Sequence, residues 1–192
     1  MGMPATKRWS VEEVRAMQDA DRAWPRYELV DGELLVTPAP TWTHQKAVVQ
    51  LLLALADYLQ RQPVGEVVAS PADIELELGT VLQPDVFVVP VRDVRPGGTW
   101  RDVRGLLLAV EVLSPSSGRH DRVTKRRFFQ RVGVPESWIV DTDSRVIERW
   151  RAGDERPELL DATLVWHPTG ADEPLTLDLA GFFARVHRDA PA

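Results

Sequence analysis

The sequence predicts a mixed α/β (α+β) domain in which helices flank a central mixed β-sheet. Two stretches, VLQPDVFVVPV and LLLAVEVLS, are apolar on both faces of a strand, which is typical of central strands in a covered sheet. The stretch THQKAVVQLLLALADYLQ has instead the periodicity of an amphipathic helix, over about residues 43–60. Covered strands and helices with one apolar side together indicate a sheet against which helices pack.

The N-terminal part is expected to form a short helix followed by a hairpin. Ser10 and Glu13 have the spacing of a capping box, which predicts a helix near residues 11–19. YELVDGELLVTP then predicts two strands that turn at Asp31-Gly32, because this dipeptide favours a tight hairpin turn.

Strands and helices continue to alternate after residue 70. DIELELG alternates acidic with apolar residues, which predicts a half-exposed strand. A helix over about 119–132 is expected to end at Gly133, because glycine is favoured just after a helix. The rest of the chain predicts a strand pair, one or two weaker strands and a closing helix, from the stretches ESWIVD, RVIERW, LLDATLVWH, PLTLDL and AGFFARV.

Composition limits the class of protein. The chain has 192 residues, 44% of them hydrophobic, and shows no repeat or linker, which favours a single domain over residues 1–192. No apolar run reaches the roughly 18 residues of a membrane-spanning helix, and the N-terminus lacks the apolar block of a secretory signal. The absence of cysteine excludes a disulfide framework and a thiolate zinc site. We therefore expect a cytoplasmic protein without a membrane partner.

Basic residues gather in two segments although the formal net charge is −6. RHDRVTKRRFFQR has six basic residues and one acid in 13 positions, and RDVRPGGTWRDVR has four arginines around a Pro-Gly-Gly loop. Nucleic acid binding depends on such local patches rather than on total charge. The alternative is that both segments are solvated faces of the protein.

Two polar residues fall on the apolar side of the arginine-rich helix. Phe128, Phe129 and Val132 define its apolar stripe on a helical wheel. Asp121 and Lys125 lie in the middle of that stripe. Because lysine is rarely buried unless it is paired, Lys125 is a candidate site residue. The alternative is that it extends to solvent or pairs with Asp121 one turn away.

Three further polar residues interrupt apolar stretches. His44 lies on the centre line of its helix's apolar stripe, where a core histidine with satisfied hydrogen bonds is the alternative. Asp85 opens one apolar strand and Glu111 interrupts the next, so the two carboxylates could lie close together. A cation between them would compensate their charges, and oxygen ligands suit Mg²⁺ or Mn²⁺ rather than zinc. The alternative is a salt bridge to Lys125 or to an arginine.

The order of these motifs resembles the PD-(D/E)XK nuclease superfamily and, within it, the Uma-type family of putative restriction endonucleases. The resemblance covers about residues 26–150 and rests on YELVDGELL, the His44 helix, QPDVFVV, EVLSPSS, Asp121, Lys125 and GVPESWIVD. It implies a restriction-endonuclease-like core. The superfamily lysine is expected two residues after the glutamate, where this chain has Leu113. Lys125 is the matching lysine in this branch.

The resemblance also implies roles for individual residues. Asp85 and Glu111 would bind Mg²⁺ or Mn²⁺, with the backbone carbonyl of Val112 as a further ligand. Lys125 would orient or activate the attacking water, and His44 would support the site. Two hairpin residues, Glu28 and Glu33, match family positions as well, but the sequence leaves open whether either reaches the metal.

These expectations define a metal-dependent endonuclease that hydrolyses phosphodiester bonds, with DNA as its nucleic acid partner. A homodimer is expected, because one acidic protomer offers only a short positive groove. Alternatives are a catalytically silent nuclease-fold module that binds nucleic acid or a protein partner, and a structural domain whose buried charges pair with one another. The residues expected to contact DNA phosphates are Arg119, Arg122, Arg126 and Arg127.

Overall fold

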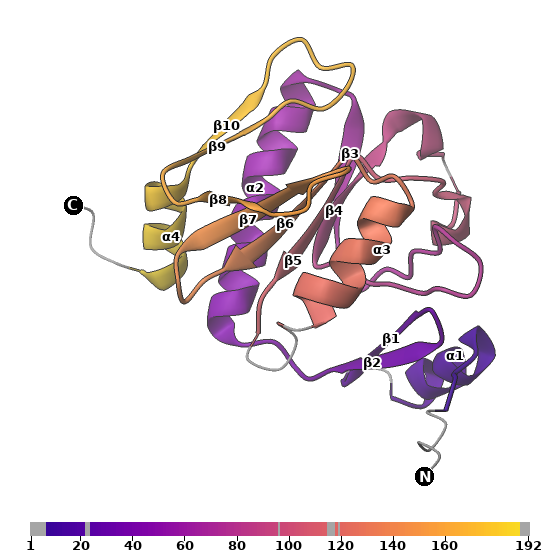
Figure 1. The fold of residues 1–192 in the computed structure, drawn as a ribbon. Coiled ribbons are helices and arrows are strands. Elements are labelled where there is room, and N and C mark those ends of the chain that lie inside the picture. The colour runs from indigo at the N-terminus through magenta and orange to yellow at the C-terminus, as the bar shows by residue number, and fades with distance from the viewer. Residues whose placement is uncertain (1–6, 22–23, 96, 115–117, 119, 189–192) are drawn as a thin grey trace.

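The computed structural model describes residues 7–21, 24–95, 97–114, 118 and 120–188. Within these ranges six strands form one central sheet (Figure 1). Neighbouring strands are antiparallel except for the central pair, β5 and β6, which are parallel. In spatial order the strands are β3 (Gly65–Ala69), β4 (Val86–Pro90), β5 (Leu108–Val112), β6 (Glu136–Asp141), β7 (Val146–Arg151) and β8 (Glu158–Leu160).

Helices cover both faces of this sheet, as the sequence predicted (Figure 1). Side chains alternate along a strand, so Leu108 and Val110 of β5 point to one face while Ala109 and Glu111 point to the other. The first face packs against two helices and a hairpin, and the second against one short helix. These elements are α2 (Trp42–Arg61), α4 (Leu179–His187), β9 (Thr163–Trp166) and β10 (Leu175–Asp178) on the first face, and α3 (Arg126–Arg131) on the second.

The N-terminal helix and hairpin form as predicted. The Ser10 side chain accepts a hydrogen bond from the Glu13 amide, and the Glu13 carboxylate accepts one from the Ser10 amide, which completes the capping box. The hairpin turns through Asp31 and Gly32, both with positive φ, as a tight turn requires. The elements are α1 (Val11–Ala20), β1 (Arg26–Val30) and β2 (Glu33–Thr37).

The strand predicted for DIELELG is wrong. Only one isolated bridge, between Ile74 and Leu82, forms there. Two acids of the segment contact α1 instead, since Glu75 pairs with Arg15 and Asp73 accepts a hydrogen bond of 3.2 Å from Gln18. Strand β3, which pairs with β4, was not predicted.

The predicted helix over 119–132 forms in two parts. The segment η3 (His120–Lys125) is a π-helix, and α3 continues it to Arg131. Gly133 follows with φ of +78°, the left-handed conformation expected of a residue that ends a helix. The buried aromatic residues of α3, Phe128 and Phe129, face the sheet as the helical wheel predicted.

Two short 3₁₀ helices, η1 (Val91–Asp93) and η2 (Trp100–Asp102), complete the regular structure of the described ranges. None of the helices in those ranges is both long enough and apolar enough to cross a membrane.

The N-terminal cap of α4 allows a test of how this helix is held. The Asp178 side chain accepts a hydrogen bond of 3.1 Å from the Gly181 amide. We expect Asp178→Ala to lower the free energy of unfolding by about 1 kcal/mol, because the first turn loses its side-chain acceptor. Urea denaturation followed by circular dichroism measures the loss, and Asp178→Asn, which keeps an acceptor, is expected to lose less.

Candidate active site

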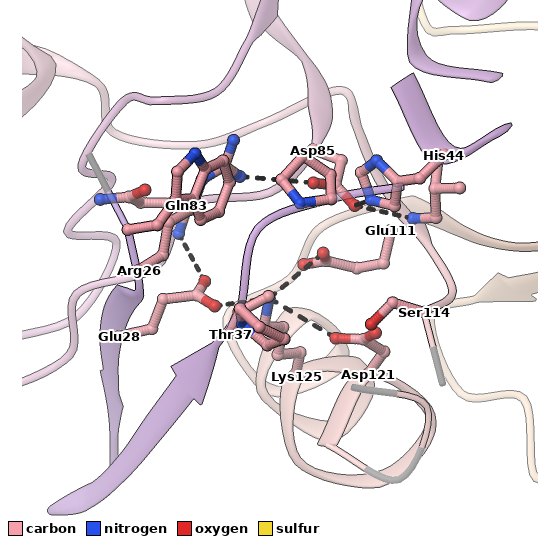
Figure 2. A pocket seen from close by; sticks show the side chains of 14 residues that line it. Arg26, Glu28, Thr37, His44, Gln83, Asp85, Glu111, Ser114, Asp121 and Lys125 are labelled. Atoms are coloured by element: carbon pink, nitrogen blue, oxygen red, sulfur yellow. Dashed lines mark hydrogen bonds and ion pairs between the residues drawn. The ribbon is translucent and has the colours of Figure 1, made fainter. Parts of the chain in front are cut away.

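A cleft lies at one end of the sheet, where β4 and β5 meet the N-terminal hairpin, α2 and η3 (Figure 2). The space within it, including solvent at its open mouth, is about 390 Å³. Most of its polar side chains come from elements that are far apart in sequence. The cleft is lined by Trp24, Arg26, Glu28, Thr37, Pro38, Pro40, His44, Gln83, Asp85, Glu111, Val112, Ser114, Asp121 and Lys125.

Lys125 is buried among three carboxylates, at 4% exposure (Figure 2). Its Nζ lies 2.8 Å from Glu28 Oε2, 3.2 Å from Glu111 Oε2 and 3.5 Å from Asp121 Oδ1. Burial alone would lower the pKa of Lys125, but the carboxylates, Glu111 foremost, raise that pKa well above 10.5. The lysine is therefore a fixed positive charge, and the prediction that it faces the sheet is confirmed.

Glu111 is the least compensated of these carboxylates. Burial raises its pKa well above the ordinary 4.5, against the opposing effect of Lys125, and the nearby charge of Asp121 raises it further. Its Oε1 atom is buried and has no hydrogen-bond partner among the described residues. Glu111 thus has one oxygen in use and one available.

Asp85 differs from Glu111 because donors surround it. Its Oδ2 accepts a hydrogen bond of 2.9 Å from the Val112 amide and lies 3.1 Å from His44 Nε2. Although burial raises the pKa of Asp85, the hydrogen bond to His44 and the other donors lower it on balance. Asp85 is consequently ionised, and its Oδ1 is occupied only by a long contact of 3.4 Å to Arg26 among the described residues.

His44 reaches Asp85 from the first turn of α2, at 7% exposure. Thr41 caps this helix by accepting a hydrogen bond from the His44 amide, which fixes the position of the turn beside the sheet. The imidazole is buried, and its Nδ1 has no partner among the described residues. His44 therefore holds a carboxylate of the cleft, so it is more than a core histidine.

Of the two hairpin acids, only Glu28 reaches the cleft. Its Oε1 accepts a hydrogen bond of 2.7 Å from the Gln83 amide, while Oε2 binds Lys125. Glu33 lies outside the cleft on an exposed part of β2, 3.8 Å from His120. Glu28 therefore lines the cleft and Glu33 does not, whereas metal contact by either residue stays untested.

The donor set fits a divalent cation that prefers oxygen ligands. Among the described residues Glu111 Oε1 has no hydrogen-bond partner and Asp85 Oδ1 has only the long contact to Arg26, and Mg²⁺ in proteins is held by one or two carboxylates and water. No three His, Asp or Glu side chains of the described ranges are arranged to hold a metal ion together. Lys125 stands at the centre of the other carboxylates, which explains why they do not form such a cage.

The arginines predicted to bind nucleic acid have different surroundings. Arg122 pairs with Glu148 at 2.6 Å and with Asp141 at 3.0 Å. Arg126 lies over the Trp150 ring, 4.3 Å from its centroid. Arg127 is exposed, and Arg119 lies outside the described residues. Nucleic acid binding by this set stays a prediction, with Arg127 the freest of its described members.

Several residues of the cleft were not selected from the sequence, and Trp24 and Arg26 are two of them. Arg26 begins a strand, where a charged residue is common, and Trp24 precedes it in a polar stretch. Neither breaks an apolar pattern, so no local signal separates these residues from ordinary surface residues.

The family and the fold of the chain follow from comparison with known proteins. Residues 11–184 match the Uma2 family, described as putative restriction endonuclease. The crystal structure of a putative nuclease belonging to DUF820 from Anabaena variabilis is similar, with a TM-score of 0.75 and 17% sequence identity. The likeness covers 93% of this chain and 99% of that one, and at this identity it shows the fold alone.

No curated protein matches the chain. The resemblance that the motifs indicated is confirmed, and it extends beyond residues 26–150 in both directions. Family membership and the shared fold support a nuclease function. Because the match spans most of its length, the chain belongs to the Uma2 family of putative restriction endonucleases.

Proposed function

We propose that the protein is a metal-dependent endonuclease that hydrolyses phosphodiester bonds in DNA. Membership of the Uma2 family supports the nuclease reaction. The metal and the DNA substrate are what we add to it here. The observation that carries it is a pair of carboxylate oxygens beside the buried, charged Lys125. Among the described residues Glu111 Oε1 has no hydrogen-bond partner, and Asp85 Oδ1 has only the contact of 3.4 Å to Arg26.

Each residue of the cleft has a chemical role in this proposal. Asp85 and Glu111, with the Val112 carbonyl, would hold Mg²⁺ or Mn²⁺, which when bound offsets charge on the phosphate and acidifies water. Lys125 places a second positive charge where the phosphate gains negative charge in the transition state. His44 keeps Asp85 oriented through its hydrogen bond of 3.1 Å.

The buried position of Lys125 makes its charge effective. An ion pair is stronger in a poorly solvated site than in water, and the side chain of Lys125 is 5% exposed. Glu28 and Asp121 also hold the amine in place, so the charge needs little reorganisation when the substrate arrives.

Cleavage assays on Asp85→Asn test this function. The wild-type protein is expected to cut plasmid DNA in Mg²⁺ or Mn²⁺ but not in EDTA. Asp85→Asn is expected to lower the rate more than about 100-fold, because it removes a charged ligand. Asp57→Asn is the matched control, since Asp57 pairs with Arg61 on the exposed surface of α2. Equal cleavage by wild type and Asp85→Asn contradicts the proposal.

A catalytically silent module with the nuclease fold is the second candidate. One observation favours it: the Lys125 amine already lies among Glu28, Glu111 and Asp121, so much of their charge is balanced without a metal. Calorimetric titration with Mn²⁺ separates the two. A nuclease is expected to bind the ion and to lose that binding in Asp85→Asn, whereas a silent module shows no heat of binding in either protein.

We also propose that the protein acts as a homodimer. The net charge of −6 gives one protomer an excess of acidic residues, and a second protomer would extend the basic surface that a DNA backbone can contact. Size-exclusion chromatography with light scattering gives the mass of the protein in solution. A monomeric mass at the protein concentration of the cleavage assay contradicts this part of the proposal.

A further inference from the structure

Two cleft residues without a role in the proposed reaction lie in contact with each other. The guanidinium of Arg26 lies over the indole ring of Trp24, 4.6 Å from its centroid. One of its terminal nitrogens lies 3.4 Å from Asp85 Oδ1, so the group points at the reaction centre (Figure 2). The Arg26 side chain is only 14% exposed.

Most hydrogen-bond donors of Arg26 have no acceptor among the described residues. A guanidinium has five N–H groups, and a good N–H···O bond measures about 2.9 Å. Asp85 is the only acceptor of Arg26 in the described part of the chain, at the long distance of 3.4 Å. By contrast, Arg131 makes four hydrogen bonds to Asp31 and Glu77. Arg26 therefore presents a nearly buried fork of donors to the cleft, which suits an anionic ligand such as phosphate.

Trp24 adds a flat apolar surface beside this phosphate-binding group. The ring is partly exposed, and Pro38 and Pro40 extend the apolar lining of the same cleft. A group that donates hydrogen bonds to phosphate, next to an aromatic ring, is a combination that binds a nucleotide. The nucleobase stacks on the aromatic side chain. In a continuous duplex the base faces are covered by neighbouring bases, so only an unpaired base can stack on protein.

We propose that Trp24 and Arg26 form a subsite for one unpaired nucleotide next to the cut phosphate. Arg26 binds the phosphate of that nucleotide, and Trp24 stacks on its base. The assignment rests on the proposed nuclease function and names its substrate class, single-stranded or locally unpaired DNA.

Equilibrium binding without cleavage tests the subsite. Fluorescence anisotropy in Ca²⁺ compares a labelled oligothymidylate with a blunt duplex of equal length. Trp24→Leu is expected to weaken binding of the single strand by about 5- to 100-fold and to leave duplex binding within about twofold. Trp24→Phe keeps an aromatic face and is expected to retain most of the affinity. Trp100→Leu is the matched control, since Trp100 is 41% exposed but does not line the cleft.

The salt dependence of binding tests the role of Arg26 separately. Arg26→Gln is expected to weaken single-strand binding and to reduce its dependence on salt by about one phosphate contact. Arg26→Lys keeps the charge without the fork and is expected to fall between Gln and wild type. Unchanged affinity and salt dependence in Arg26→Gln would overturn the role of Arg26.

A measurement on wild-type protein covers the case in which Trp24→Leu does not fold. Oligothymidylates with one base removed at successive positions are compared with the intact strand. One position is expected to lose affinity by the same factor as Trp24→Leu, whereas equal affinity at all positions overturns the subsite. The nuclease assay gives a separate answer: cleavage lost in Asp85→Asn together with normal binding by Trp24→Leu keeps the nuclease and rejects the subsite.

Discussion

Replacing Glu111 by glutamine is expected to abolish cleavage and at the same time to stabilise the metal-free protein. Glutamine keeps the shape of the side chain but removes the charge that a divalent cation needs. The rate is expected to fall more than about 100-fold. Glu111 is 3% exposed and burial raises its pKa, so the neutral amide avoids the free-energy cost of a buried charge.

The stabilisation by Glu111→Gln depends on pH in a defined direction. Below pH 4.5 Glu111 is protonated in the folded and the unfolded state alike, and the two proteins are expected to have similar stability. Above that pH the unfolded state releases the proton while the raised pKa makes the folded state retain it. The metal-free wild type therefore loses stability as pH rises through the folded pKa, and the variant does not.

Thermal unfolding in EDTA at several pH values measures this difference. Glu66→Gln is the matched control, because Glu66 lies on an exposed position of β3. Added Mn²⁺ is expected to raise the melting temperature of wild type but not of Glu111→Gln. A variant less stable than wild type at neutral pH in EDTA, or one that still cuts DNA, contradicts the prediction.

Lys125→Met is expected to cause the largest loss of stability. Methionine fits the space, but three buried carboxylates lose the amine that lies within 3.5 Å of each of them. Removing one partner of a buried ion pair costs about 3–5 kcal/mol, because the remaining charge stays buried without compensation. Urea denaturation at neutral pH measures the loss.

A second substitution shows whether charge or packing causes that loss. Glu111→Gln added to Lys125→Met is expected to restore part of the stability, since one uncompensated carboxylate is gone. Lys46→Met is the matched control, because the Lys46 amine contacts only the Arg185 carbonyl among the described residues, at an exposed position. Equal urea midpoints for wild type and Lys125→Met refute the electrostatic explanation.

The sequence predicted the elements whose local signals agree with their environment. The capping box at Ser10 and the turn at Asp31-Gly32 are short-range patterns that need no distant partner. DIELELG misled because alternation also arises when acids pair with side chains of another element, here Arg15 of α1. Strand β3 was missed because a short edge strand has no strong pattern of its own.

The site residues also divide into those that break a local sequence pattern and those that do not. Lys125, Asp121, His44 and Glu111 stood out because each is polar in an apolar pattern, and such residues are costly to bury without a reason. Arg26 broke no pattern, so only the arrangement in space reveals it. The distances around Lys125 could not be predicted either, since they depend on a hairpin that is distant in the sequence.

The π-helix His120–Lys125 has an evolutionary consequence. A π-helical turn holds one more residue than an α-helical turn, so deleting one residue such as Val123 would turn it into a regular helix. Phe128 and Phe129 anchor the part after the turn, and the part before it would rotate by about 100°. Asp121 would then lie three residues before Lys125 instead of four, a spacing that still places both on one face of the helix. A single in-frame deletion would therefore turn the residues before the deletion relative to the sheet, while the two anchored phenylalanines keep their place.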